Sequence, residues 1–211
     1  MTDQEELSVA GINVSRETLA ALRGFEQLVR RWTPAINLVS KSTLQDFWNR
    51  HIVDSAQVFS HYPPSARQWV DLGSGGGFPG LVVAILAREL QPSLRVVLVE
   101  ADLRKATFLR QAVQELRLQA EVRSDRIESL QPLAADVLSA RALAPLSELL
   151  AFADQHLLPD GVAIFQKGSR YNEELVAAIK SWDFEVEVQQ SLSEPSAAIL
   201  VIRKIKRAKH A

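Results

Sequence analysis

The feature that most constrains this chain is a glycine-rich turn between a buried strand and an apolar helix. The segment Asp71-Leu-Gly-Ser-Gly-Gly-Gly-Phe-Pro-Gly80 follows the strand-like run Gln68 to Leu72 and precedes an apolar helical stretch that reaches Leu90. Glycines at such a junction let the backbone approach a ligand closely, and the first turn of the helix offers unpaired N–H groups with a partial positive charge. The segment therefore predicts a ligand-binding cleft at one edge of a sheet.

An acidic residue at the end of the next strand narrows the choice of ligand. Glu100 ends the predicted strand Leu94 to Glu100, and open α/β folds bind ligands at the carboxyl ends of their strands. A carboxylate in this place can accept hydrogen bonds from two ribose hydroxyls, which predicts a ligand that contains a nucleoside. The alternative is a purely structural role, in which the glycines only make a tight turn and Glu100 is a solvated residue at the end of a strand.

Two nucleoside cofactors compete for this turn. Gly75-x-Gly77-x-x-Gly80 satisfies the nicotinamide dinucleotide fingerprint, and Glu100 lies twenty residues after Gly80. That fingerprint should begin where the strand ends, whereas here the strand has already ended and Gly73 takes the first turn. Asp71-x-Gly73-x-Gly75 is better interpreted as a site for S-adenosylmethionine, whose ammonium group suits an acidic strand end.

The first third of the chain is predicted to be helical. Apolar residues recur at three- and four-residue steps from Arg16 to Trp32, and Pro34 is expected to end this helix. A second helix is expected to follow Ser42 as its N-cap and to end before Pro63. This pattern predicts a helical N-terminal extension over residues 1–62.

The remainder, residues 66–211, alternates short apolar runs with helical stretches, which is typical of βαβ units. Beyond Glu100 we expect strands at 120–124, 137–140 and 162–166, the last after a turn at 159–161, and helices at 102–118, 146–157 and 173–182. The two final runs, 185–190 and 197–205, have no helix-length segment between them and should pair antiparallel. The prediction is an α/β domain with a mostly parallel sheet and a C-terminal antiparallel hairpin.

Composition excludes several kinds of chemistry. The chain has 211 residues, no cysteine and four histidines with no metal-ligand spacing, so a disulfide scaffold, a cysteine nucleophile and a zinc site are not expected. The N-terminus is acidic and no apolar run approaches the length of a membrane span, which predicts a cytoplasmic protein without a membrane partner. A net charge of −1 leaves nucleic-acid binding to local basic segments, of which Arg203 to Lys209 is the densest.

Several separated motifs, taken in order, make the chain similar to a known family. Besides the glycine-rich turn they are Asn37-Leu-Val-Ser40, Arg50-His-Ile-Val-Asp-Ser55, Lys105-Ala-Thr-Phe-Leu-Arg110, Arg126-Ile-Glu128, Arg141-Ala142 and Lys167-Gly168. Over nearly its whole length the chain resembles the RsmG (GidB) 16S ribosomal RNA 7-methylguanosine methyltransferases of bacteria.

The resemblance implies a Rossmann-like class I methyltransferase fold, S-adenosylmethionine as the cofactor, and a guanine in the decoding region of 16S rRNA as the methyl acceptor. It also implies cofactor contacts at Gly73, Phe78, the Ile127–Glu128 pair and Arg141, which join Asp71, Gly75 and Glu100 in the predicted cofactor-binding set. No catalytic residue is assigned, because guanine N7 carries a lone pair and no proton, so methylation there requires no general base. We expect a monomer whose partner is 16S rRNA or the small ribosomal subunit.

Predicted substrate contacts are Arg50, His51 and Lys167. Two of them have a structural alternative: His51 lies on an apolar stripe and could be a packing residue, and Lys167 could serve the fold alone. Arg104, Lys105 and Arg110 could likewise be a solvated helix face, and the basic tail a solubilising segment. Two other functions stay open, a small-molecule methyltransferase and a non-catalytic ribosome-associated RNA-binding factor.

Overall fold

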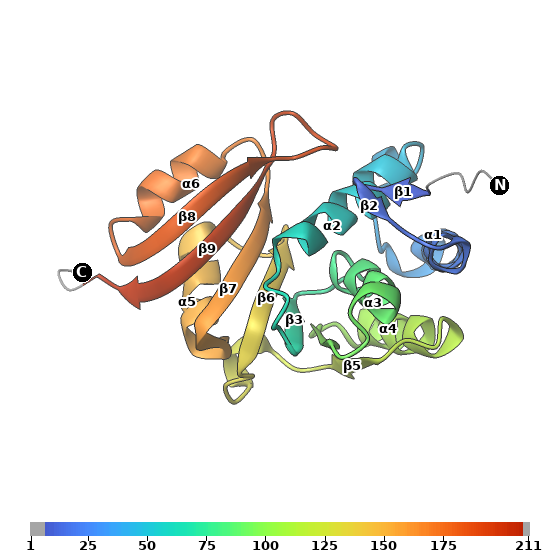
Figure 1. Cartoon of the computed structure of the whole chain (residues 1–211), viewed down its shortest axis with the longest axis horizontal. Coiled ribbons are helices and arrows are strands. Elements are labelled where there is room, and N and C mark those ends of the chain that lie inside the picture. The colour runs from blue at the N-terminus through green and yellow to red at the C-terminus, as the bar shows by residue number, and fades with distance from the viewer. Residues whose placement is uncertain (1–6, 209–211) are drawn as a thin grey trace, which may run out of the picture.

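The computed structural model describes residues 7–208, which form a three-layer α/β/α arrangement around a seven-stranded sheet (Figure 1). The strand order is β5-β4-β3-β6-β7-β9-β8. The strands are β3 (Gln68–Leu72), β4 (Arg95–Val99), β5 (Ala120–Arg123), β6 (Ala135–Arg141), β7 (Leu157–Lys167), β8 (Trp182–Gln190) and β9 (Ala198–Arg207). The order reverses beside β3, where the chain crosses from β5 back to β6, and this switch point is where such sheets bind ligands.

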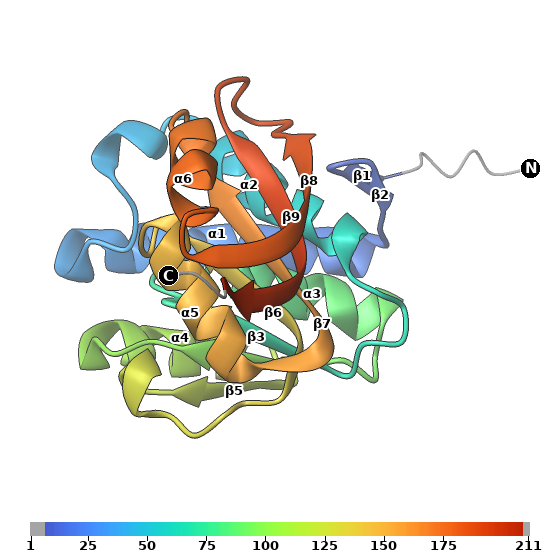
Figure 2. The same ribbon diagram turned by 90° about the vertical axis from the view of Figure 1, so that its left-hand side faces the viewer.

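Two apolar cores, one on each face, hold the helices to the sheet. The helices are α1 (Arg16–Ile36), α3 (Gly80–Leu90) and α4 (Leu103–Glu115) on one face, and α5 (Leu146–His156) and α6 (Tyr171–Ala178) on the other. Strand side chains alternate between the faces, so that Trp69 packs in the first core and Val70 in the second. Figure 2 looks onto the β8–β9 end of this sheet.

The predicted fold class is confirmed. β3, β4, β5, β6 and β7 pair in parallel, and β9 pairs antiparallel with both β7 and β8. The division into an extension over 1–62 and a domain over 66–211 stays a prediction. Phe25 of α1 and Val82 of α3 belong to one continuous apolar cluster, so the N-terminal helix packs on the sheet layer.

The predicted end of the first helix at Pro34 is wrong. Helix α1 continues to Ile36, and Asn37 terminates it in the left-handed conformation with φ 51°, its N–H donating to the Thr33 carbonyl. Proline has no N–H and so removes one backbone hydrogen bond. Only two helical residues follow Pro34 before the cap at Asn37, so the loss of this one bond does not end the helix.

The single helix predicted after Ser42 is also wrong. The structure has short pieces instead: η1 (Lys41–Thr43, a 3-10 turn), η2 (Trp48–Val53, a π-helix), α2 (Asp54–Ala56) and η3 (Gln57–His61, a 3-10 turn). Ser42 lies inside η1 rather than at an N-cap. An apolar stripe indicates which side chains are buried but not which carbonyl each N–H bonds, and a π-turn changes that bonding.

Smaller differences lie at element ends. The predicted helix 173–182 is α6, which ends at Ala178, and β8 already begins at Trp182. The predicted turn at 159–161 lies within β7, at an irregularity in its pairing with β6. Between the pairs Ala135–Leu157 and Val137–Val162, β7 advances five residues while β6 advances two. The hairpin of β1 (Ser8–Val9) and β2 (Ile12–Asn13) was not predicted, because two-residue strands are too short to show alternation.

The fold predicts that Gly80→Ala destabilises the protein. A Cβ at Gly80 would lie 2.6 Å from Asp71 Oδ2 and closer still to Leu98, and overpacking of this kind costs about 1–3 kcal/mol. Urea unfolding at pH 7 measures the loss. The control is Gly24→Ala in α1, where the nearest atom is 3.5 Å away and alanine should stabilise the helix by up to about 1 kcal/mol. Equal stability of the two variants would contradict the close contact.

Candidate functional site

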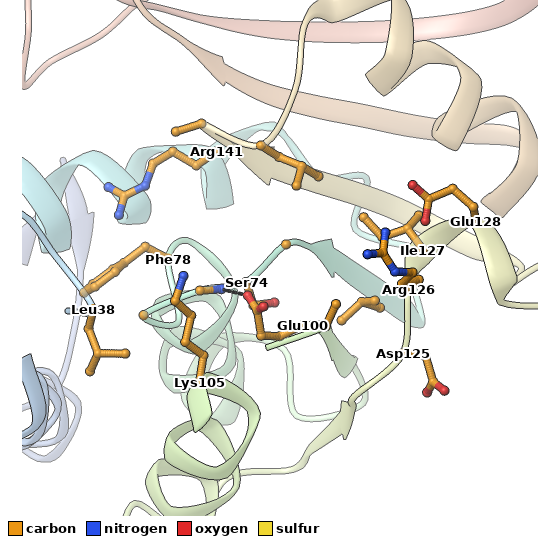
Figure 3. Close-up of a pocket in the computed structure, with 17 residues that line it drawn as sticks. Leu38, Ser74, Phe78, Glu100, Lys105, Asp125, Arg126, Ile127, Glu128 and Arg141 are labelled. Atoms are coloured by element: carbon orange, nitrogen blue, oxygen red, sulfur yellow. Dashed lines mark hydrogen bonds between the residues drawn. The ribbon is translucent and has the colours of Figure 1, made fainter. Parts of the chain in front are cut away.

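The carboxyl ends of β3, β4 and β6 open onto a cavity of about 450 Å³ (Figure 3), which we call the first cavity. Its walls come from the glycine-rich turn, the end of β4, the segment around η4 (Ile127–Ser129) and the end of β6. The volume lies within the range of small-molecule sites. The lining residues are Leu38, Gly73, Ser74, Gly75, Gly76, Phe78, Val99, Glu100, Ala101, Lys105, Asp125, Arg126, Ile127, Glu128, Arg141, Ala142 and Leu143.

Asp71 supports the turn from below and is not in this lining. Its side chain is fully buried, with Oδ2 accepting from the Gly80 N–H at 3.2 Å and Oδ1 accepting from Ser139 Oγ at 2.6 Å. Burial raises the pKa of Asp71 to about 6, although these hydrogen bonds act in the opposite direction. The carboxylate therefore fastens the start of α3 to β3 and β6.

Glu100 is the acidic group that reaches the cavity. Its Oε2 accepts from the Gly75 N–H and its Oε1 from the Asp102 N–H, each at 2.8 Å. Gly75 has φ +54°, a conformation that side chains other than glycine rarely adopt. In Figure 3 Glu100 lies between Phe78 and Ile127. A carboxylate oxygen can accept more than one hydrogen bond, so Glu100 keeps acceptor capacity for a ligand.

The opposite wall of the first cavity contains residues that the sequence analysis did not assign. Ile127 and Glu128, which are predicted to contact the cofactor, lie there beside the unassigned Asp125 and Arg126. Leu38 also lines the cavity, and its carbonyl oxygen is 3.0 Å from the place of a Cβ at Gly76. The sequence motifs could have indicated Leu38 and Arg126 as cavity residues, since Leu38 belongs to the motif Asn37–Ser40 and Arg126 to the motif Arg126–Glu128.

Arg141, at the end of β6, is held by residues of the N-terminal region. One terminal nitrogen donates to Asp54 Oδ2 at 3.2 Å, and the other donates to His51 Nδ1 at 3.2 Å. The guanidinium carbon lies 4.8 Å from the centre of the Phe78 ring, a cation–π contact. Figure 3 shows this group beyond Phe78, on the side of the cavity away from Ile127.

His51 is fixed in one tautomer by its two partners. Arginine only donates, so Nδ1 of His51 accepts from Arg141 and Nε2 carries the hydrogen that it donates to Thr43 Oγ1 at 2.8 Å. Burial, followed by the charges of Arg141 and Arg50, lowers the pKa of His51 to about 3. The imidazole is therefore neutral at physiological pH.

The three predicted substrate residues lie together, in a second cavity of about 230 Å³. Arg50, His51 and Lys167 line it, and Arg141 lines both cavities. Lys167 donates to the Ala144 carbonyl at 2.9 Å and pairs with Glu174 at 2.7 Å. The segment that follows Arg141 is thereby anchored to α6.

The other basic candidates do not join either cavity, apart from Lys105 in the first. Arg104 is exposed and pairs with Asp102 at 3.3 Å, and Arg110 donates to Ser124. The basic tail up to Arg207 belongs to β9, while its last residue, Lys209, lies outside the described residues. Within residues 7–208 no group of three or more acidic or histidine side chains could hold a metal ion, and no helix there could cross a membrane.

The fold and the cleft at its switch point define a class of protein. The chain superposes on a methyltransferase from Geobacter sulfurreducens with a TM-score of 0.57 at 18% identity, covering 87% of this chain and 88% of that one. M. jannaschii TYW2, solved in complex with AdoMet, gives a TM-score of 0.53 at 14% identity, with 81% and 78% covered. The architecture is that of the Rossmann-like methyltransferases.

Sequence comparison then identifies the family. The family described as GidB, rRNA small subunit methyltransferase G, matches residues 18–202, and the chain belongs to it. A protein of Ruegeria pomeroyi named ribosomal RNA small subunit methyltransferase G is 52% identical over 196 residues, covering 93% of this chain and 96% of that protein. One of the same name from Cereibacter sphaeroides is 50% identical over 201 residues, with 95% and 98% covered.

The neutral, buried His51 predicts a specific pH dependence of stability. Its folded pKa lies below its ordinary value of 6.5, so the unfolded state binds the extra proton and stability falls as pH drops below about 6.5. Between pH 7 and pH 5 the wild type should lose about 2 kcal/mol more free energy of unfolding than His51→Gln, at 1.36 kcal/mol per pH unit. Urea unfolding at the two pH values measures this difference, and parallel losses would contradict a neutral His51.

Proposed function

We propose that this protein transfers the methyl group of S-adenosylmethionine to N7 of a guanine in the decoding region of 16S rRNA. The observation that carries the proposal is the pairing of two cavities across Arg141. One is suited to a nucleoside cofactor at the switch point of the sheet, and the other contains Arg50, His51 and Lys167. Membership of the rRNA small subunit methyltransferase G family supports the RNA substrate.

The residues of the first cavity fit this cofactor. Glu100 can accept hydrogen bonds from the two ribose hydroxyls while it keeps its bonds to the turn. Val99 and Ile127 offer apolar surface for an adenine ring, and Asp125 and Glu128 lie at its polar edge. When bound, S-adenosylmethionine supplies an activated methyl group. Asp71 contributes to the site by fixing the turn and not by contact.

The chain's own part in the reaction is to position the base. N7 of guanine already carries its lone pair, so the neutral His51, committed to Arg141 and Thr43, need not remove a proton. Holding two reactants in line can supply about 7–11 kcal/mol of the barrier reduction. The cations Arg50, Arg141 and Lys167 suit the negative charge and carbonyl groups of RNA.

The direct test is methyl transfer from radiolabelled S-adenosylmethionine. Small ribosomal subunits, or their naked RNA, from a strain that lacks the family's enzyme are incubated with the protein, and the labelled nucleotide is mapped. We expect 7-methylguanosine at a single decoding-region site. Cofactor binding without label in either RNA would contradict the proposal and favour a non-catalytic RNA-binding factor. Label in a metabolite pool would favour a small-molecule methyltransferase.

The cofactor assignment predicts that Glu100→Gln weakens S-adenosylmethionine binding. The amide removes the charge that the ribose hydroxyls would bond to, and hydrogen bonds to charged groups are worth about 1.5–3 kcal/mol, so Kd should rise roughly tenfold or more. Titration calorimetry measures Kd. The matched control is Glu121→Gln, the same change at an exposed position of β5 where the glutamate pairs with Arg123, which should leave Kd unchanged. The assignment fails if both variants bind like the wild type.

A further inference from the structure

The second cavity has walls from four parts of the fold. They are the N-terminal segment from Thr43 to Asp54, which includes the π-helix η2, the end of β6, the end of β7, and the β8–β9 connection (residues 191–197) with the start of β9. Arg141 separates it from the first cavity. Figure 1 shows the β8–β9 connection projecting at the same end of the sheet as α2. A ligand here would lie directly beside one in the first cavity.

Asp54 holds the wall of the second cavity in place, and both of its carboxylate oxygens are fully occupied by hydrogen bonds. Besides Arg141, its Oδ2 accepts from Gln166 Nε2 at 2.7 Å. Its Oδ1 accepts from Gln57 Nε2 at 3.0 Å and from Ser193 Oγ at 2.6 Å. These donors come from four different segments, so the carboxylate locks their positions and has no free lone pair for a ligand.

Gln166 presents an acceptor whose orientation is set by Asp54. Its Nε2 donates to both the carbonyl and the carboxylate of Asp54, and these two groups only accept hydrogen bonds. The amide cannot be turned over, so Oε1 is on its other side. Gln166 is 7% exposed, its Oε1 is itself buried, and within residues 7–208 this oxygen has no hydrogen-bond partner. A buried acceptor without a partner is unfavourable, and a ligand N–H would satisfy it.

Arg141 supplies the complementary donor. A guanidinium carries five N–H groups. Three are committed to Asp54, His51 and the Arg50 carbonyl, and the stacking on Phe78 fixes the plane of the group. The remaining N–H groups can donate to a carbonyl oxygen at the boundary between the cavities.

We propose that the second cavity binds the target guanine, flipped out of the RNA, with Arg141 donating to O6 and Gln166 Oε1 accepting from N1–H. This assignment rests on the proposed function. Guanine carries O6 between N7 and N1, so a base held at O6 by the boundary residue turns N7 toward the first cavity and N1 into the second. Adenine has the opposite pattern, a donor at N6 and an acceptor at N1, and meets two mismatched groups.

Because Gln166 Oε1 is buried, part of the cavity wall has to move when a base enters, and we assign this movement to the β8–β9 connection. Glu194 in this connection pairs with Arg50 at 2.7 Å, and both side chains are 38% exposed. Ion pairs with this exposure contribute little to stability, so the pair can open at small cost when a base enters. Arg50 is then free to contact the RNA backbone, in agreement with its predicted role.

The test compares two buried amides that both donate to Asp54. Gln166→Met removes the proposed acceptor for N1–H together with its bonds to Asp54. Gln57→Met also removes a donor to Asp54, and in addition the bonds of Gln57 to Ser191 Oγ and the Leu192 N–H, but Gln57 does not line the cavity. With small ribosomal subunits we expect Gln166→Met to lower kcat/KM by about 10- to 100-fold, the range for one base contact, with Kd for S-adenosylmethionine unchanged. Gln57→Met should stay within about threefold of the wild type.

A second arm uses the wild type with RNA that carries a replaced base at the target position. Inosine keeps O6 and N1–H and lacks only the exocyclic amine, so it should be methylated within about threefold of guanosine, while adenosine should fall by at least about 100-fold. Absence of label with guanosine would reject the proposed function itself. Normal turnover by Gln166→Met, equal losses in both glutamine variants, or inosine as poor as adenosine would each overturn the base pocket.

Discussion

The structure depends on one buried carboxylate, that of Asp71. It receives the first N–H of α3 and the hydroxyl of Ser139, so a single side chain joins β3, the helix that follows it and the neighbouring strand β6. Leaving such a group unpaired would cost several kcal/mol. The hydrogen bonds of Asp71 to Gly80 and to Ser139 are therefore expected to form together with the fold. The close approach allows only glycine at position 80. Glu100 can meet the backbone of the turn because Asp71 holds that turn in place.

The N-terminal region completes the site and does not merely precede it. Arg141 belongs to the sheet, but its partners His51 and Asp54 lie 90 and 87 residues earlier in the chain. Asp54 also binds the β8–β9 connection through Ser193, 139 residues later. Three distant segments therefore meet at the carboxyl edge of β6 and β7, and the π-turn of η2 brings Arg50 and His51 to that edge.

The sequence allows the sheet and the glycine-rich turn to be predicted because both depend on local signals. Short apolar runs that alternate with helical stretches indicate β3 and β4, and glycines between a strand and a helix indicate the turn. Glu100 could be placed because it ends a strand. Pro34 and the broken helix after Ser42 were mispredicted, since an apolar stripe carries no information about backbone bonding. The role of Asp71 beneath the turn, the saturation of Asp54 and the salt bridge of Lys167 with Glu174 depend on contacts between distant residues, which periodicity cannot reveal.

The shared wall formed by Arg141 has a thermodynamic consequence. A ligand in either cavity that changes the hydrogen bonds or the tilt of this guanidinium changes the wall of the other cavity, since the same side chain lines both. Binding in the two cavities is then linked, and linkage is reciprocal: whatever factor the cofactor applies to RNA affinity, the RNA applies to cofactor affinity. The spent cofactor and the methylated base, which now carries a positive charge close to Arg141, would be coupled through the same contact, so each product favours or opposes release of the other.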